Sequence, residues 1–177
     1  FRSPVDEPAE ATLDAIESAL TALLKDNDLQ GPDLAAIGIA VPGVVDPKKG
    51  RVVVTPNMNL SGVQVVARLE SRFGVPVALG NDTNCGTLGE TWLGAARGAK
   101  SVFGMFVGTG VGGGFVQKKK VWRGYRHAAA EIGHIVMAVD GPECGCGNRG
   151  CLEAMASRSA MERDLRAAID QGRQTVL

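Results

Sequence analysis

Four potential metal ligands lie in one short segment, and this cluster constrains the fold of the chain more than any other feature. His134 is followed, after nine residues, by Cys144, and then by Cys146 and Cys151. Three thiolates and one imidazole complete the tetrahedral shell of a structural zinc ion and leave no open position for a substrate. The alternatives are a chance cluster of cysteines or a local disulfide. We predict a structural zinc site, with glycines at 145, 147 and 150 allowing the backbone to fold tightly around the ion.

The distribution of the cysteines also bears on the compartment. An oxidised, secreted domain is expected to pair its cysteines across the fold, whereas three of the four cysteines here are crowded together. The fourth, Cys85, we expect to be a buried thiol. No stretch approaches the roughly 20 apolar residues that cross a bilayer, and the N-terminus lacks the apolar core of a signal peptide. We therefore predict a cytoplasmic protein without a membrane partner.

The charges of the chain balance, with 19 Lys and Arg residues against 19 Asp and Glu residues. Such a balance argues against a broad nucleic-acid footprint, although a local basic patch would survive the averaging. We expect no nucleic-acid partner through this segment. The hydrophobic fraction of 45% is sufficient to build a core.

The first half of the chain alternates between helical and strand patterns. Helical periodicity at 8–25 is followed by a continuous apolar run at 34–41, which is typical of a strand buried on both faces. A short return strand follows at 51–55, and then a helix at 63–73, a strand at 75–79 and a helix at 83–95. This order predicts an α/β layer architecture, with ligand-binding loops after the strands.

The pattern changes near residue 100. A strand at 101–107, a glycine-rich turn at 108–114 and a returning strand at 115–117 predict a hairpin. A compact loop at 144–150 leads into helical sequence from Leu152 onward. We predict two domains, residues 1–98 and 99–177.

The cysteine segment resembles the signature of the ROK family (repressors, open reading frames and sugar kinases). The pattern is G-H-x9-C-x-C-G-x2-G-C-x-E, preceded by Glu131-Ile-Gly-His134, which resembles the E-x-G-H box of the family. The resemblance implies that Glu131, His134 and Glu153 line a hexose site, with zinc holding His134 so that its second edge faces the sugar. Without this context, Glu131 and Glu153 would be interpreted as solvated surface residues.

Asn81-Asp82 lies where a strand ends and a helix begins, a position at which such residues ordinarily cap the helix. The ROK family has a catalytic aspartate in a matching N-D-x-N box. The resemblance therefore implies that Asp82 is the general base and that Asn81 binds the sugar beside it. Thr55-Pro-Asn57 also resembles a family segment near the sugar, which implies that Asn57 contacts a hydroxyl; a turn asparagine is the alternative.

The glycine-rich turn lacks the Gly-Lys-Ser/Thr ending of a Walker loop and does not open a helix. Taken alone, it indicates an ordinary tight hairpin. A similar turn forms the second phosphate loop of actin-like sugar kinases, and the resemblance implies phosphate contacts from five residues: Gly108, Thr109, Gly110, Gly112 and Gly113.

By this resemblance we expect an actin-like ATPase (ribonuclease H-like) α/β fold with two domains, incomplete at both ends. The first phosphate loop of the family and its C-terminal portion are absent, so we expect an internal fragment that is inactive alone. The expected function is transfer of phosphate from ATP, with Mg²⁺, to a hexose or N-acetylhexosamine. A sugar-sensing ROK repressor, with its helix-turn-helix upstream, is the alternative, and a non-catalytic sugar-binding scaffold is a third. Relatives commonly form homodimers or homotetramers.

Overall fold

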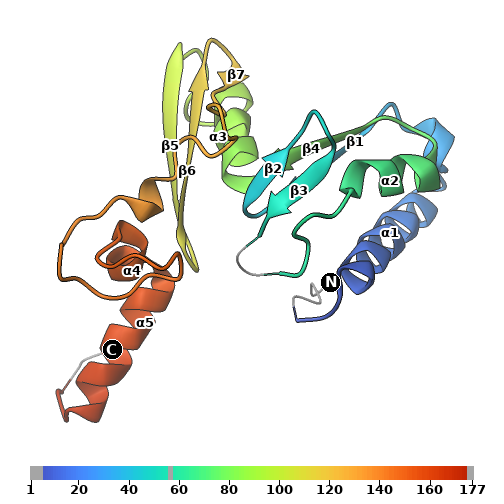
Figure 1. Ribbon diagram of the computed structural model, residues 1–177. Coiled ribbons are helices and arrows are strands. Elements are labelled where there is room, and N and C mark those ends of the chain that lie inside the picture. Colours follow the sequence, from blue (N-terminus) through green and yellow to red (C-terminus); the bar gives the residue numbers. More distant parts are fainter. Residues whose placement is uncertain (1–5, 56–57, 175–177) are drawn as a thin grey trace. The chain divides into compact units, whose positions relative to one another are not determined.

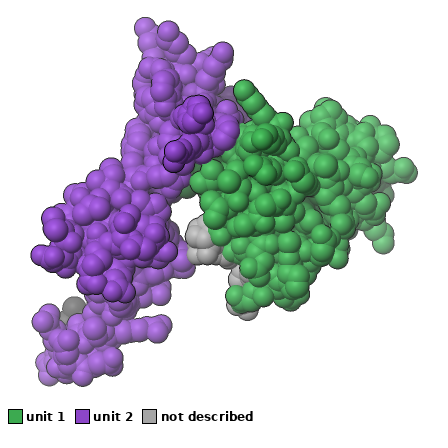
Figure 2. Space-filling view, viewed as in Figure 1, with its two compact units in different colours: residues 1–85 green, residues 86–177 purple. Residues whose placement is uncertain are grey.

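The computed structural model describes residues 6–55 and 58–174, and the chain divides into two compact units, residues 1–85 and 86–177 (Figure 2). Asn57, a predicted sugar contact, lies outside the described residues. The two units meet inside helix α3 (Asp82–Trp92), whereas the expected domain boundary follows residue 98. That boundary stays a prediction.

The first unit contains a parallel pair of strands, β1 (Ile37–Val41) and β4 (Val77–Asn81) (Figure 1). Their register runs from Ile37 opposite Val77 to Val41 opposite Asn81. Strand β1 begins three residues later than the apolar run, after a 3₁₀ turn, η1 (Gly31–Asp33). The parallel pairing confirms a mixed α/β arrangement and brings the carboxyl ends of both strands to one edge.

A hairpin and a helix connect these two strands. The hairpin consists of β2 (Val44–Asp46) and β3 (Arg51–Val54), and the helix is α2 (Val65–Phe73). Gly43, just before the hairpin, has φ +89°, and a Cβ built there would lie 2.2 Å from the carbonyl oxygen of Val54. Only glycine permits this close backbone approach.

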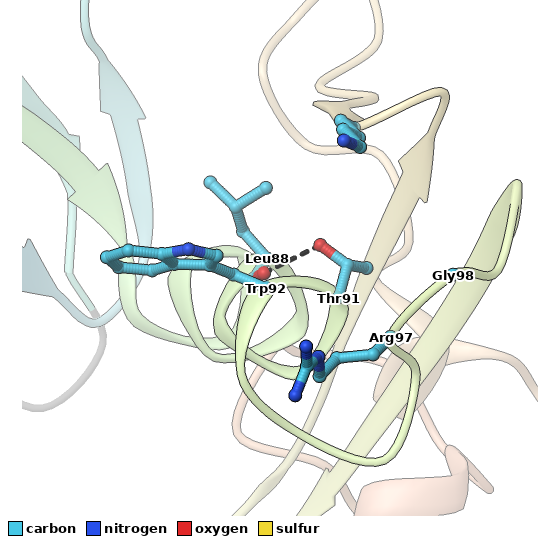
Figure 3. A pocket seen from close by; sticks show the side chains of 6 residues that line it. Leu88, Thr91, Trp92, Arg97 and Gly98 are labelled. Carbon is cyan, nitrogen blue, oxygen red and sulfur yellow. Dashed lines mark hydrogen bonds between the residues drawn. The ribbon is translucent and has the colours of Figure 1, made fainter.

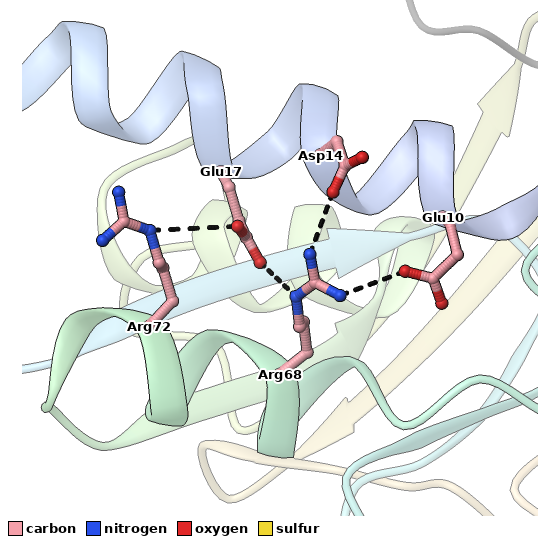
Figure 4. Close-up of polar contacts among 5 residues, drawn as sticks. All are labelled: Glu10, Asp14, Glu17, Arg68 and Arg72. Carbon is pink, nitrogen blue, oxygen red and sulfur yellow. Dashed lines mark hydrogen bonds and ion pairs between the residues drawn. The ribbon is translucent and has the colours of Figure 1, made fainter.

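Helix α1 (Ala9–Asp26) packs against α2 and extends the apolar core of the first unit. Across this contact, the Arg68 guanidinium on α2 donates to three carboxylates of α1, those of Glu10, Asp14 and Glu17 (Figure 4). The hydrogen bond to Glu17 is the main cause that raises the pKa of Arg68 above its ordinary value. The arginine therefore links α2 to three carboxylates along one face of α1.

The second unit contains an antiparallel sheet of β5 (Ser101–Val107), β6 (Val111–Gln117) and β7 (Lys120–Val121) (Figure 1). The turn between β5 and β6 covers only 108–110, because β6 already begins at Val111. Gly112 and Gly113 therefore lie in the ladder, opposite Phe106 and Met105. The prediction that the turn extends over 108–114 is wrong in this respect.

Three short elements complete the second unit: a 3₁₀ turn, η2 (Ile132–His134), and two helices, α4 (Leu152–Ala156) and α5 (Arg158–Asp170). The helix predicted from Leu152 onward is interrupted at Ser157, whose Oγ accepts a hydrogen bond from the Ala160 amide and caps α5. In the described part of the chain, no helix has the length and apolar character needed to cross a membrane.

The expectation that Cys85 is a buried thiol is wrong, since its side chain is exposed. Helix α3 turns Asn84 and Thr87 inward, with 9% and 0% exposure. On a helix, successive residues are about 100° apart, so Cys85 is carried away from the buried face.

Substitution of Leu69 tests the core of the first unit. Leu69 on α2 is 0% exposed, so Leu69→Ala should lower the free energy of unfolding by about 3 kcal/mol through lost burial and a cavity. Ser71→Ala, at an exposed position of the same helix, should change it by less than about 0.5 kcal/mol. Denaturant unfolding of the chain would measure both, and equal effects would contradict this assignment of the core.

Candidate metal centre and adjoining carboxylates

The four predicted zinc ligands come together in the second unit. One ligand atom from each of His134, Cys144, Cys146 and Cys151 lies within 4.8 Å of all the others. The His134 Nδ1 is 3.7 Å from the Cys144 Sγ, and the Cys146 Sγ is 3.7 Å from the Cys151 Sγ.

These distances match those around a tetrahedral zinc ion. Zinc–sulfur bonds of about 2.3 Å place two sulfurs about 3.8 Å apart, and zinc–nitrogen bonds of about 2.0 Å place nitrogen about 3.5 Å from sulfur. A disulfide needs a sulfur–sulfur distance of about 2.05 Å, and none of the four cysteines forms a disulfide in the structure. The cluster is therefore consistent with a zinc site and not with a local disulfide.

Backbone contacts hold the loop that carries the cysteines. Glu143 and Arg149 form an antiparallel bridge, inside which the Cys144 amide donates to the Asn148 carbonyl at 2.8 Å. Gly150 has φ +69°, and a Cβ there would lie 1.6 Å from the carbonyl oxygen of Ala138. A side chain at this position would push the loop apart, so glycine is required.

The three thiols differ in their readiness to ionise. Burial raises the pKa of Cys151 to about 12, and burial also raises the pKa of Cys144 above its ordinary value. A backbone hydrogen bond from Asn148 lowers the pKa of Cys146. A divalent cation would hold all three as thiolates and displace the protons of the two buried thiols.

Glu153 is not a solvated surface carboxylate. Its Oε2 accepts a hydrogen bond from the Val111 amide at 2.8 Å, and its Oε1 is 3.9 Å from the Cys144 Sγ. Glu153 therefore joins the cysteine loop, residues 144–151, to the start of β6. Glu131 precedes η2 as its N-terminal flanking residue and is exposed.

Three glycines allow these elements to approach one another. A Cβ on Gly110 would lie 2.3 Å from the Glu153 Oε2, and one on Gly113 would lie 2.3 Å from the Ala130 carbonyl oxygen. A Cβ on Gly133 would lie 2.0 Å from the Val111 carbonyl oxygen. The glycines of the hairpin thus have a packing role that the sequence did not indicate, beside the predicted contacts with phosphate.

The turn at 108–110 is anchored to the start of α5. The Arg158 guanidinium donates to the Thr109 Oγ1 at 2.9 Å, and the Ser159 hydroxyl donates to the Thr109 carbonyl at 2.9 Å. The Arg158 amide also donates to the Gly108 carbonyl at 2.9 Å. Sequence reasoning missed Arg158 and Ser159, because nothing in their local pattern indicates contact with a turn so far away along the chain.

In the first unit, Asn81 acts as the cap that its position suggests. Its Oδ1 accepts hydrogen bonds from the Asn84 amide and the Thr83 hydroxyl, both at 2.9 Å. Its Nδ2 donates to the Gly43 carbonyl at 3.0 Å and to the Asp82 Oδ1 at 3.1 Å. The Asn81 amide therefore links the ends of β1 and β4 and orients Asp82.

Asp82 is exposed at the first residue of α3, and its two carboxylate oxygens differ. Its Oδ1 accepts from Asn81 and from the Thr83 amide, the latter at 2.8 Å. Its Oδ2 has no hydrogen-bond partner within the part of the chain that the structure describes. One oxygen thus fixes the side chain, and the other remains an available proton acceptor.

Comparison with known proteins connects these motifs to enzymes and to regulators. Glucokinase of Thermotoga maritima is 40% identical over 154 residues, which cover 86% of this chain and 48% of that enzyme. A putative xylose repressor of Caldicellulosiruptor is 34% identical over 166 residues, which cover 94% of this chain and 42% of that repressor. Among solved structures, the chain resembles a ROK family glucokinase from Streptomyces griseus in complex with glucose and AMPPNP. The TM-score is 0.80 at 36% identity, and the match covers 93% of this chain and 51% of the glucokinase.

The chain thus spans about half the length of the relatives that it matches. Its mixed α/β fold matches the corresponding part of a ROK kinase, and glucokinases and xylose repressors resemble it at similar identity. The sequence profile of the ROK family matches residues 2–175, so the chain belongs to the ROK family.

Proposed function

We propose that the complete protein is an ATP-dependent kinase that phosphorylates a hydroxyl of a hexose or N-acetylhexosamine. The observation that carries the proposal is the carboxylate of Asp82, with Oδ1 held by Asn81 and Thr83 and Oδ2 available. A sensor that only binds sugar has no need for a free proton acceptor held in this way. The glucokinase relatives support the same reaction class.

In this mechanism Asp82 is the general base. A sugar hydroxyl attacks the γ-phosphorus of ATP, the bond from that phosphorus to the bridging oxygen breaks, and ADP leaves. The hydroxyl proton passes to the Oδ2 of Asp82, because a neutral hydroxyl is a poor nucleophile until its proton has an acceptor. Asn81 would keep the carboxylate in place, and Mg²⁺ would enter with the nucleotide.

The remaining contacts are proposed by resemblance to the family. The turn at 108–110, with Gly112 and Gly113 behind it, would contact the phosphates of ATP within an actin-like fold of the complete protein. Glu131, His134 and Glu153 would contact the sugar, together with Asn81 and Asn57. Zinc held by the four ligands would be structural, fixing the ring of His134 through Nδ1 and leaving Nε2 for a hydroxyl. We also propose a cytoplasmic homodimer or homotetramer.

The second candidate is a sugar-responsive repressor, and one observation favours it. The putative xylose repressor matches 94% of this chain, about as well as the glucokinases do. In that case the residues proposed to contact the sugar would bind it without turnover.

Asp82→Asn in the complete protein tests the proposed base. Turnover of the preferred sugar should fall by about 10²- to 10⁴-fold, because the amide cannot take the proton. Sugar affinity should change little, since the new Oδ1 can still accept from Asn81 and Thr83. A coupled assay of ADP release over a panel of hexoses and N-acetylhexosamines, with ATP and magnesium, measures turnover.

A matched control is Asp28→Asn, the same chemical change on an exposed loop residue with φ +54°, which asparagine tolerates. It should retain wild-type turnover. Unchanged turnover in Asp82→Asn would remove Asp82 as base, and sugar binding without turnover in the wild type would favour the repressor.

Cys146→Ser tests the metal site. The wild-type chain should retain about one zinc ion after dialysis, and Cys146→Ser should lose it, because one thiolate is missing from the tetrahedral shell. Cys85→Ser is the matched control, since this exposed thiol lies outside the cluster. Metal analysis of the three proteins is the measurement; equal zinc in Cys146→Ser would overturn the ligand assignment.

A further inference from the structure

A cavity of about 490 Å³ lies beside α3 in the second unit (Figure 3). Six residues line it: Leu88, Thr91, Trp92, Arg97, Gly98 and Lys119. They include no thiol, imidazole or carboxylate, so this cavity offers no group for metal binding or for thiol redox chemistry. The thiols of the second unit lie elsewhere, in the cysteine loop at 144–151.

The three thiols of the cysteine loop differ in their access to solvent. Cys146 is exposed, whereas Cys144 and Cys151 are buried, with 7% and 0% exposure. The susceptibility of a cysteine to oxidation increases with its accessibility. An oxidant in solution therefore meets the sulfur of Cys146 before the other two.

Cys146 also has a second sulfur at close range. Its Sγ is 3.7 Å from the Sγ of the buried Cys151. The Cys144 Sγ lies 3.7 Å from the His134 Nδ1 and 3.9 Å from the Glu153 Oε1. When an accessible thiol is oxidised beside another thiol, the second sulfur can attack the first and form a disulfide. The geometry therefore makes Cys151 the partner of Cys146.

The backbone around Cys146 has room for the movement that a disulfide requires. The two sulfurs must approach from 3.7 Å to about 2.05 Å. Gly145 and Gly147 flank Cys146, and a Cβ built on either would meet no atom within 4 Å. At the other end of the loop, Gly150 lies tightly against the Ala138 carbonyl. The segment that carries Cys146 can therefore move toward Cys151 while the packed end of the loop stays in place.

We propose that Cys146 and Cys151 form a reversible disulfide in response to peroxide. The Cys146 thiolate attacks one oxygen of hydrogen peroxide, so that a sulfur–oxygen bond forms, the oxygen–oxygen bond breaks and hydroxide leaves. The Cys151 thiolate then attacks the sulfenic sulfur, so that the disulfide forms and a second hydroxide leaves. The two sulfurs together lose two electrons, which reduce the peroxide, and the two hydroxides take up two protons and become water.

The disulfide removes two of the four ligands of the metal site. His134 and Cys144 alone cannot complete a tetrahedral zinc shell, so the zinc ion should be lost. The ring of His134, which we propose contacts the sugar, then loses the bond that orients it. A thiol reductant can reach the disulfide at the exposed Cys146 and restore both thiols. The inference rests on the zinc site proposed above and does not depend on the kinase activity.

Trypsin, which cleaves after lysine and arginine, distinguishes this disulfide from one between neighbouring cysteines. Because Arg149 lies between Cys146 and Cys151, cleavage leaves Cys144 and Cys146 on the peptide 127–149 and Cys151 on the peptide 150–158. A disulfide from Cys146 to Cys151 links the two peptides, whereas one from Cys144 to Cys146 does not. Fragmentation of the linked peptides in the mass spectrometer then identifies the cysteine that carries the link.

The experiment treats the zinc-loaded chain with hydrogen peroxide. A chromogenic chelator measures the zinc released, and mass spectrometry of the tryptic peptides measures the disulfide. About one zinc ion per chain should be released in step with the linked peptides, and dithiothreitol with added zinc should reverse both changes. Cys85 is exposed and lies outside the cluster, so its oxidation in the same sample shows that the peroxide dose reaches an ordinary surface thiol.

Two variants provide the comparison. Cys146→His replaces the exposed thiol by a second imidazole, and two thiolates with two imidazoles also form a tetrahedral zinc shell. This variant should keep its zinc at the peroxide dose that empties the wild type. The matched control Cys85→Ser should release zinc as the wild type does. If Cys146→His binds no zinc, the linked peptides of the wild type decide the question.

The outcomes are distinct. Linked peptides that appear together with free zinc would support the proposal. Zinc retained at a dose that oxidises Cys85 would overturn it, as would zinc loss with Cys146 converted to sulfinic acid and no linked peptides. A link from Cys144 to Cys151 would also overturn the assignment of Cys146. Absence of zinc before treatment would overturn the metal site and this inference with it, and the zinc content of the untreated chain distinguishes that failure from the others.

Discussion

Close backbone approach at a few glycines is the constraint on which the candidate sites depend. In the second unit, Gly113 admits the segment that leads into η2, and Gly133 of η2 lies against the Val111 carbonyl. Gly110 makes room for the Glu153 carboxylate, which receives the Val111 amide. The result is that the β5–β6 hairpin, the cysteine loop at 144–151 and α4 share contacts, although the hairpin is far from the other two in sequence. A methyl group on Gly113 or Gly133 would collide with a backbone carbonyl oxygen and push these elements apart.

In the first unit, one glycine allows a close backbone approach and one asparagine connects the elements that meet there. Gly43 lets the β2–β3 hairpin return close to the end of β1, and its carbonyl accepts the amide of Asn81 at the end of β4. Asn81 in turn caps α3 and holds Asp82. The orientation of the proposed base therefore depends on a hydrogen bond between two strand ends, which the parallel register of β1 and β4 makes possible.

Much of this arrangement could be predicted from the sequence, for identifiable reasons. Continuous apolar runs predict β1 and β4, and helical spacing of apolar residues predicts α1 and α2. Both patterns can be recognised within a short stretch of sequence, so they need no knowledge of distant contacts. The four side chains that cluster in the second unit, His134, Cys144, Cys146 and Cys151, could be named because thiols and imidazole at this close spacing have few other uses. The true extent of the β5–β6 turn could not be predicted, because glycines occur equally in turns, in phosphate-binding loops and where backbones pack closely. The contacts of Arg158 and Ser159 with Thr109 join positions about 50 residues apart, and no local pattern encodes such a pairing.

The charges are divided unevenly between the two units, with twelve Lys and Arg against eight Asp and Glu in residues 86–177 and seven against eleven in residues 1–85. This division has a practical consequence. Adsorption to an ion exchanger depends on the face that a protein presents and not on its total charge. A chain with a sequence pI near 6.9 would ordinarily be expected to flow through both types of resin at neutral pH. With an excess of lysines and arginines on one unit and an excess of carboxylates on the other, it should instead be retained by both. Its chromatography would resemble that of two proteins of opposite sign joined in one polypeptide.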